Sequence, residues 1–536
     1  MALEGNRHTN RPLVERAGWA VFWNAAFFPI KILVPFVASV VVVRQLRGEG
    51  FAILSLATAL LTFLGLFADL GIERTLPRFY PEIEMRYGRR GTVRLLFMVA
   101  LIKGAVLFLL IGALGLFPDY WISTFDLGEM GGWLLVFIAM LLVLGAASDV
   151  SVQFLYAHFR QKVTNSLDVL AAVVYPGLTA LLVLAGWNVL GAMLALLITT
   201  ILSVVLALWQ VWRLLREMPQ EPHRKASEVK IPSTRPLRER LVSFAGLNYL
   251  INWTVYLYDL PFVVLAVSLL VVAPQDKILE VAVVALAYKF TKQFLRALVV
   301  PLTGVQTPLF ARLYAEGRIE GLNTAYATIT KFLLLALLPS GVGLVLIARN
   351  VLQVLYGQVG LDAVVTQLTM PSIIACTAVL AFGLFGEAII SVALNVLMVY
   401  EDYRAVITAR LVALISIPLM LLLVPELGAV GAALAAATAG LASRGVALGY
   451  AVARLGLRFP GSFFVRVGTA SLLMGAALIP FLAFLPPNIP STLLMLLTGV
   501  AVFYAAFKLL GGMDTEDKDR FLALRIPFAQ RVLRFL

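Results

Sequence analysis

The sequence has few charged residues for its length. Only 14% of its 536 residues are Asp, Glu, Lys or Arg, while 61% are hydrophobic, and soluble domains usually carry about 25% charged residues. This deficit excludes an ordinary soluble protein and indicates a chain that crosses a membrane many times. The net charge of +13 does not imply nucleic-acid binding, because the chain has no soluble basic domain to hold a nucleic acid. Lys and Arg in membrane-flanking loops explain the excess more simply.

Cysteine and histidine are nearly absent. Cys376 is the single cysteine, which excludes a disulfide within the chain and a cysteine metal cluster. The three histidines, His8, His158 and His223, lie outside the apolar segments and share no spacing, so we expect no metal site. The sequence also lacks a P-loop, an HExxH motif and a Ser/His/Asp set with a histidine at membrane depth. We therefore expect no ATP-driven motor, no cofactor and no enzyme.

Long apolar segments fill the rest of the chain. A spanning helix needs about 20 apolar residues. Fourteen segments qualify, at about 17–43, 51–73, 93–117, 132–156, 167–186, 190–212, 241–269, 280–303, 323–347, 366–398, 405–424, 428–450, 467–485 and 491–510. The fifth and sixth are separated only by a tight turn at Gly186-Trp187-Asn188, and the eleventh and twelfth only by Pro425-Glu426-Leu427-Gly428.

The distribution of Lys and Arg predicts the orientation. If the N-terminus is cytoplasmic, the outer loops contain few cations, namely Arg44, Arg47, Lys277 and Arg349, and most of the others fall inside. This bias predicts that both termini are cytoplasmic and that the number of crossings is even.

The polar stretches divide the chain. We predict a cytoplasmic N-terminus (1–16), an N-lobe of six helices (17–212), a cytoplasmic linker (213–240), a C-lobe of helices seven to twelve (241–450), two further helices (467–510) and a cytoplasmic tail (515–536). Arg residues interleave with Phe and Leu along the tail, which is typical of an interfacial amphipathic helix.

Two sequence echoes indicate an internal repeat. Val34-Pro35-Phe36-Val37 in the first helix is echoed by Leu260-Pro261-Phe262-Val263 in the seventh, and the segment 77–82 by 311–316. Both repeats begin with an odd-numbered helix, so they share one orientation. We therefore predict an all-α polytopic membrane protein of about 14 transmembrane helices, with two parallel six-helix lobes plus two C-terminal helices, and transporters commonly bind substrate between such halves.

Several motifs resemble those of a known family. They are Ala68-Asp69-Leu70-Gly71 through Arg78-Phe79, the segment 308–317, Val354-Leu355-Tyr356-Gly357, and the segment 427–433. From about residue 17 to 450 the chain resembles the Wzx-type polysaccharide flippases of the multidrug/oligosaccharidyl-lipid/polysaccharide exporter (MOP) superfamily. The resemblance implies alternating access between the lobes. Flippases of this superfamily carry isoprenoid-pyrophosphate-linked sugars from the inner to the outer leaflet.

The first candidate site consists of cationic residues that lie inside the apolar segments. Lys289, Lys292 and Arg296 are spaced i, i+3, i+7 and share one helix face. Each charge at the bilayer centre costs at least about 2.5–3.5 kcal/mol, so this face should meet an anion in a cavity. Lys31 lies near the middle of the first helix with Asn24 on the same face, and could join them. The alternatives are that Arg296 snorkels to the inner surface and that Asp259 pairs with Lys289.

Two other polar groups are weaker candidates. Asn248, Asn252, Tyr256 and Asp259 follow helical spacing in the predicted seventh helix and suit a sugar, although Asn often only joins helices in membranes. Glu387 and Asp149 are membrane-depth carboxylates that could couple transport to H⁺ or Na⁺. The alternative is that Glu387 or Asp149 forms a structural ion pair with Lys103, Arg410 or Arg444.

These observations and the resemblance predict a flippase for an anionic lipid-linked oligosaccharide in a bacterial or archaeal cytoplasmic membrane. Its expected partners are the lipid-linked substrate, membrane lipids and, as candidates, a polysaccharide polymerase and export machinery. The function of a lipid II flippase is an alternative, because such a flippase also has fourteen helices and a cationic cavity. A cation-coupled multidrug exporter should favour an acidic cavity and twelve helices, and a membrane glycosyltransferase should have large outer loops.

Overall fold

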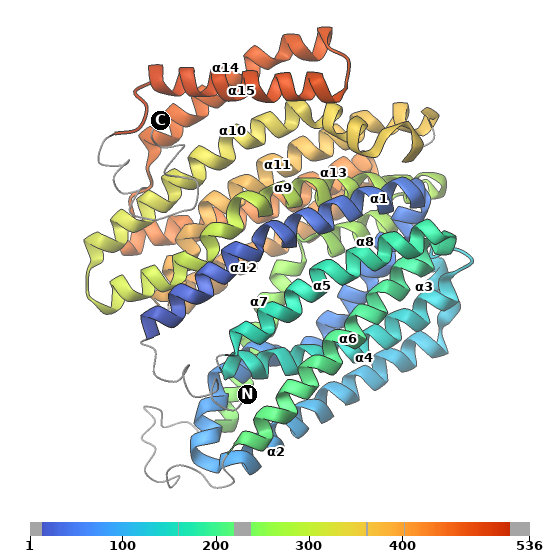
Figure 1. Cartoon of the computed structure of the whole chain (residues 1–536), viewed down its shortest axis with the longest axis vertical. Coiled ribbons are helices and arrows are strands. Elements are labelled where there is room, and N and C mark those ends of the chain that lie inside the picture. The colour runs from blue at the N-terminus through green and yellow to red at the C-terminus, as the bar shows by residue number, and fades with distance from the viewer. Residues whose placement is uncertain (1–12, 159, 219–236, 361–362, 401, 515–536) are drawn as a thin grey trace. The chain divides into compact units, whose positions relative to one another are not determined.

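The computed structural model describes residues 13–158, 160–218, 237–360, 363–400 and 402–514, and the regular structure of these residues is entirely helical (Figure 1). The first part of the chain contains α1 (Leu13–Asp69), α2 (Ile72–Leu116), α3 (Pro118–Thr124), α4 (Gly131–Ala157), α5 (Gln161–Leu182), the π-helical turn η1 (Val183–Trp187) and α6 (Asn188–Glu217). The second part contains α7 (Leu237–Tyr256), α8 (Leu260–Leu270), α9 (Pro274–Ala315), α10 (Ile319–Gly360), α11 (Ala363–Val399), α12 (Tyr403–Leu411), the 3₁₀ turn η3 (Val412–Ile415), α13 (Ser416–Leu455), α14 (Gly461–Phe484) and α15 (Ile489–Leu509).

The number of membrane crossings follows from breaks within the longest helical stretches. Among the described residues nine stretches are long and apolar enough to cross a membrane, and three of them contain 37, 56 and 53 residues. About 20 residues suffice for one crossing. Each of these three contains a residue with positive φ, namely Arg47 (58°), Gly186 (89°) and Gly428 (53°). Counting each as two crossings, and adding the bent pair α7–α8 and the charged helix α9, gives the fourteen crossings predicted.

The predicted seventh helix is wrong in one respect, because it is broken. The segment 241–269 is divided between α7 and α8, which are bent by 58° relative to each other. The carboxylate of Asp259 accepts the N–H of Leu260 at 2.8 Å, and Pro261 stands in the first turn of α8, where a missing N–H is harmless. Asp259 therefore does not continue the α7 face that carries Asn248 and Asn252. An Asp followed two positions later by Pro is itself a helix-start signal, which the continuous apolar pattern obscured.

The chain forms two compact units. Unit 1 comprises Met1–Gln45 and Ala57–Trp253, and unit 2 comprises Leu46–Leu56 and Thr254–Leu536. The short segment after the break in α1 thus packs with unit 2. Of the predicted linker, residues 213–217 belong to α6 and 237–240 to α7, while 219–236 lie outside the described residues, as does the predicted tail 515–536.

The core of unit 1 is closed by aromatic side chains and a histidine. Tyr80 of α2 and Phe154 of α4 are almost fully buried. His158, directly after α4, places Nε2 2.6 Å from the Tyr80 hydroxyl and Nδ1 2.8 Å from the carbonyl oxygen of Phe154. Burial lowers the pKa of His158, which favours the neutral ring. Both ring nitrogens are therefore used in joining α2 to the end of α4.

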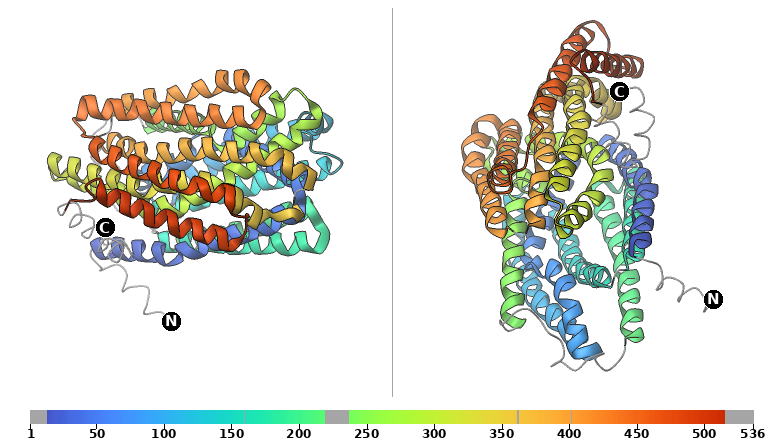
Figure 2. Two further views of the ribbon diagram at one scale, coloured as in Figure 1. Left: turned by 90° about the horizontal axis from the view of Figure 1, so that it is seen from above. Right: turned by 90° about the vertical axis from the view of Figure 1, so that its left-hand side faces the viewer.

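The core of unit 2 depends on small residues. α13 packs closely on α11, and a Cβ added to Gly383 would stand 2.8 Å from the Cα of Ala437. Buried alanines and glycines between positions 428 and 440 of α13 thus form a helix-packing surface. The break at Gly428 is bridged from α9, where the carboxylate of Glu280 accepts the N–H of Ala429 at 2.6 Å. The last two helices, α14 and α15, run side by side in the same unit (Figure 2).

Candidate functional site

The cationic face of α9 lies in unit 2, but its three members have different surroundings. The Nζ atom of Lys292 lies 2.5 Å from Oδ1 of Asp259. Tyr288 also donates its hydroxyl to this oxygen, at 3.1 Å. The alternative in which Asp259 pairs with Lys289 is therefore wrong. The break between α7 and α8 places the carboxylate beside Lys292 instead.

Lys289 has no carboxylate among its contacts in the described part of the chain. Its Nζ atom donates to Oγ of Ser55 at 3.2 Å and stands 4.5 Å from the ring centre of Phe51. Both residues belong to the short α1 segment that packs with unit 2. A hydroxyl and an aromatic face stabilise an ammonium group but do not neutralise it. These contacts therefore do not neutralise the positive charge of Lys289.

A second charged pair is more deeply buried. Arg444 of α13 and Glu387 of α11 lie 2.9 Å apart, and their side chains are 12% and 15% exposed. The structure thus pairs Glu387 with one of the three cations that the sequence offered. Arg444 also donates to the Tyr258 hydroxyl at 3.3 Å, and Arg410 donates to the same oxygen at 3.1 Å.

Hydrogen bonds connect the two pairs through the break between α7 and α8. Tyr288 donates to the carbonyl oxygen of Tyr258 at 3.2 Å, in addition to its contact with Asp259. Ser416 donates to the carbonyl oxygen of Leu257 at 2.5 Å. The backbone groups freed by the break are thus satisfied by side chains of α9 and α13. We call Asp259, Tyr288, Lys292, Tyr258, Arg410, Arg444 and Glu387 the break network.

The break network and Lys289 together favour an anion. They contain four cationic side chains, Lys289, Lys292, Arg410 and Arg444, and two carboxylates, Asp259 and Glu387. In surroundings of low dielectric constant, such an excess attracts negative charge more strongly than it would in water. Arg296, about one turn beyond Lys292 along α9, is exposed. Sequence reasoning named Arg410 and Arg444 only as pairing partners and missed Ser55 and Tyr288, whose hydroxyls carry no periodic signal.

The predicted sugar-binding face of α7 is used for packing in unit 1. Asn252 donates to Oδ2 of Asp69 at 2.5 Å, and Asn248 donates to the carbonyl oxygen of Phe244 at 2.8 Å. Trp253 packs edge-on against Phe67, with ring centres 5.1 Å apart. Asn252 therefore follows the alternative of joining helices, here α7 to α1, whereas Asn248 bonds back to its own helix. Tyr256 is buried, with its ring 5.8 Å from that of Phe262 in unit 2.

Three further predicted site residues are Lys31, Asn24 and Asp149. Lys31 and Asn24 lie in the first part of α1, and their side chains are outside the described residues. Asp149 lies partly buried in α4 of unit 1. Within the described residues no group of three or more His, Cys, Asp or Glu side chains could hold a metal ion.

The long apolar helices define a class, the polytopic helical membrane proteins. The fold is similar to that of a lipid II flippase, MurJ, in an inward closed conformation, with a TM-score of 0.71 over 91% of this chain and 98% of that chain, at 15% identity. It is also similar to an inward-facing multidrug resistance MATE family transporter of the MOP superfamily, with a TM-score of 0.56 over 79% and 94% at 15% identity. A third similar structure is that of a point mutant of the Vibrio cholerae MATE transporter VcmN, with a TM-score of 0.50 over 83% and 99% at 15% identity.

The sequence then identifies the family. Residues 20–314 match the model of the family described as polysaccharide biosynthesis protein, and the chain belongs to this family. No curated protein matches the sequence. The protein is therefore a multi-pass membrane protein of the polysaccharide biosynthesis family, with a fold similar to those of a MurJ flippase and a MATE transporter.

Proposed function

We propose that this protein flips an anionic, isoprenoid-pyrophosphate-linked oligosaccharide, the repeat unit of a polysaccharide, from the inner to the outer leaflet by alternating access. The family to which the chain belongs supports a role in polysaccharide biosynthesis. The excess of cations around the break network supports an anionic headgroup rather than a cationic drug.

The observation that carries the proposal is the environment of Lys289. Its ammonium group meets a hydroxyl and a ring but no carboxylate in the described part of the chain. Holding an unneutralised cation away from water is costly. A pyrophosphate bound to Lys289 would supply the missing charge through short, charge-assisted hydrogen bonds. The cost of burying the cation is then recovered only when substrate is present.

We assign different roles to the other predicted residues. Lys292 is already held by Asp259, so it can share a phosphate only in competition with that carboxylate. The amide donors of Asn248 and Asn252 are engaged within unit 1, and we do not assign them to the sugar. Contacts of Lys31 and Asn24 with substrate stay predictions, as does coupling to H⁺ or Na⁺ through Asp149 or Glu387.

Flipping by purified protein in proteoliposomes tests the role of Lys289. With a fluorescent isoprenoid-pyrophosphate oligosaccharide, Lys289→Gln should slow flipping about 10- to 100-fold, because one hydrogen bond to a charged group is lost. Lys289→Arg should retain part of the rate. Lys508→Gln, which removes an exposed cation at the end of α15, is the control for net charge. A folded Lys289→Gln protein that flips at the wild-type rate would refute the proposal.

A lipid II flippase is the second candidate, because the match to a lipid II flippase structure extends over 91% of this chain. The two candidates differ in the group attached to the pyrophosphate. The same proteoliposomes should be loaded with lipid II and, separately, with a lipid-linked oligosaccharide that lacks peptide. Faster flipping of the peptide-free substrate supports our proposal, whereas a preference for lipid II favours the alternative.

A further inference from the structure

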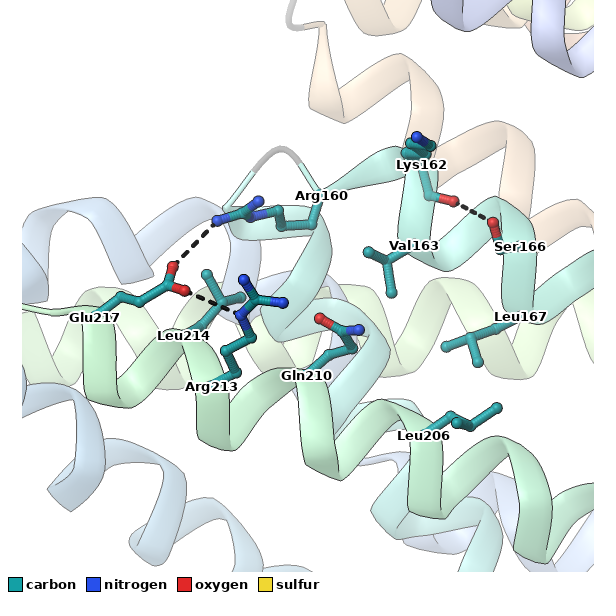
Figure 3. A pocket seen from close by; sticks show the side chains of 10 residues that line it. All are labelled: Arg160, Lys162, Val163, Ser166, Leu167, Leu206, Gln210, Arg213, Leu214 and Glu217. Carbon is teal, nitrogen blue, oxygen red and sulfur yellow. Dashed lines mark hydrogen bonds and ion pairs between the residues drawn. The ribbon is translucent and has the colours of Figure 1, made fainter. Parts of the chain in front are cut away.

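Unit 1 contains a basic pocket that the proposed transport function does not use. It lies between the start of α5 and the end of α6 and has a volume of about 410 Å³ (Figure 3). Arg160, Lys162 and Arg213 line it together with a single carboxylate, that of Glu217. The charges that line the pocket are therefore positive in sum. We call this the α5–α6 pocket.

Glu217 orients two guanidinium groups without consuming their donors. Arg213 donates Nε–H to Glu217 at 3.1 Å, and Arg160 donates from one terminal nitrogen at 3.4 Å. A guanidinium has five N–H donors, so both arginines keep others available. The three side chains are 52%, 61% and 49% exposed for Arg160, Arg213 and Glu217, respectively. Ion pairs this exposed are weak, and an incoming phosphate can share or replace the carboxylate.

The α5–α6 pocket is amphipathic along its length. Val163, Leu167 and Leu206 line the part away from Glu217, with Lys162 next to Val163, while Arg160, Arg213 and Glu217 gather at the other end (Figure 3). Leu206 and Glu217 are eleven residues apart on α6, which corresponds to about 16 Å. A free phosphate would fill only the charged end. A phosphate that carries an acyl chain would also cover the apolar part.

Exposed tryptophans on α6 favour a pocket at the depth of lipid headgroups. Trp209 and Trp212 are exposed on the same turns of α6 as Gln210 and Arg213. Tryptophans gather at the membrane–water interface, where lipid phosphates also lie. Basic pockets between helices at this level suit anionic lipid headgroups.

We propose that the α5–α6 pocket binds an anionic phospholipid of the phosphatidylglycerol or cardiolipin type. Arg160 and Arg213 hold the phosphodiester, and Lys162 adds positive charge to the pocket. The amide of Gln210 binds a glycerol hydroxyl, and the start of an acyl chain lies on Val163, Leu167 and Leu206. Such a lipid joins the start of α5 to the end of α6. The site does not involve Lys289, so it can exist whatever substrate the protein flips.

Native mass spectrometry of the purified full chain tests the proposal. With phosphatidylglycerol added, the Lys162→Gln/Arg213→Gln double variant should lose affinity about tenfold or more, because each cation near the headgroup contributes to attraction. Phosphatidylcholine should bind weakly to both proteins. Arg216→Gln is the matched control: Arg216 is also on α6, stacks 3.6 Å over the ring of Trp212, and does not line the pocket. Its affinity should change less than twofold.

Further arms distinguish the source of the phosphate and the integrity of the fold. Phosphatidylglycerol should raise the thermal unfolding midpoint of the wild-type protein, whereas inorganic phosphate should not. Leu206→Gln should weaken binding of the lipid. Unchanged phosphatidylglycerol binding by the double variant would overturn the proposal. So would an equal stabilisation by inorganic phosphate combined with a Leu206→Gln variant that still binds lipid normally.

Discussion

Buried charges in unit 2 differ in how completely their partners neutralise them. Glu387 and Arg444 form a well-buried pair, while Lys292 and Asp259 are each about one-third exposed and Lys289 has no carboxylate partner in the described part of the chain. A buried pair adds little stability over an apolar pair of similar size, but removing one member leaves an unpaired charge. The paired residues therefore have a structural role, and Lys289 is the residue to which we assign the proposed anion.

At the residue scale, Glu387→Gln should be strongly destabilising. It leaves Arg444 buried without its anion, and breaking such a pair costs about 3–5 kcal/mol. The double variant Glu387→Gln/Arg444→Met should recover most of this loss, since neither charge is then buried. Thermal unfolding of the purified proteins in detergent measures both effects. If the single and double variants melt together well below the wild type, the loss does not arise from an unpaired Arg444.

At the element scale, the positions of helix ends depend on residues that tolerate unusual backbone conformations or close contact. Gly71 precedes α2 with φ of 65°. A Cβ added there would overlap the carbonyl oxygen of Ala245 and stand 2.7 Å from the amide nitrogen of Tyr249, both on α7. The start of α2 can therefore pack on the backbone of α7 only because residue 71 has no side chain.

Gly71→Ala should accordingly destabilise unit 1 by about 2–4 kcal/mol, the sum of overpacking against a rigid backbone and a left-handed conformation for a residue with a Cβ. Gly112→Ala is the matched control, because Gly112 lies within α2 and a Cβ there meets open space. In a helix this change is neutral or stabilising by up to about 1 kcal/mol. Thermal melts of the two variants should separate clearly, and similar melts would contradict the close approach.

At the scale of the whole molecule, the distribution of cations predicts which side of the membrane each loop occupies. The native chain is a convenient background for testing this, because its single cysteine, Cys376, is buried. Ser123 in α3 and Ser462 at the start of α14 are both exposed. The charge bias predicts that the first is outside the cell and the second is cytoplasmic.

A membrane-impermeant maleimide added to intact cells should therefore label a cysteine introduced by Ser123→Cys and leave Ser462→Cys unlabelled until the membrane is permeabilised. The unmodified chain should be labelled in neither condition. Labelling of Ser462→Cys in intact cells, with Ser123→Cys protected, would invert the orientation and place the α5–α6 pocket in the outer leaflet.

Much of the fold could be predicted because its determinants are local. The number of crossings follows from the length of apolar segments, since each must satisfy its own backbone in lipid. The tight turns at Gly186 and Gly428 were visible because glycine tolerates positive φ. Even the charged helix α9 was identifiable, because three cations share one of its faces. The class, the crossings and the presence of a helix with a cationic face can thus be read from the amino-acid sequence alone.

Which of those cations are paired depends on the folded chain. Asp259 and Lys292, Glu387 and Arg444, and Asn252 and Asp69 come from different helices and lie 33, 57 and 183 positions apart. Their pairing depends on helix packing and on the break between α7 and α8, and no spacing along the chain encodes the distance between such atoms. The α5–α6 pocket arises in the same way, because its two walls are the start of one helix and the end of the next. The sequence presents the three cations on α9 as equivalent. In the structure Lys292 pairs with Asp259, Arg296 is exposed, and Lys289 has no carboxylate partner in the described part of the chain.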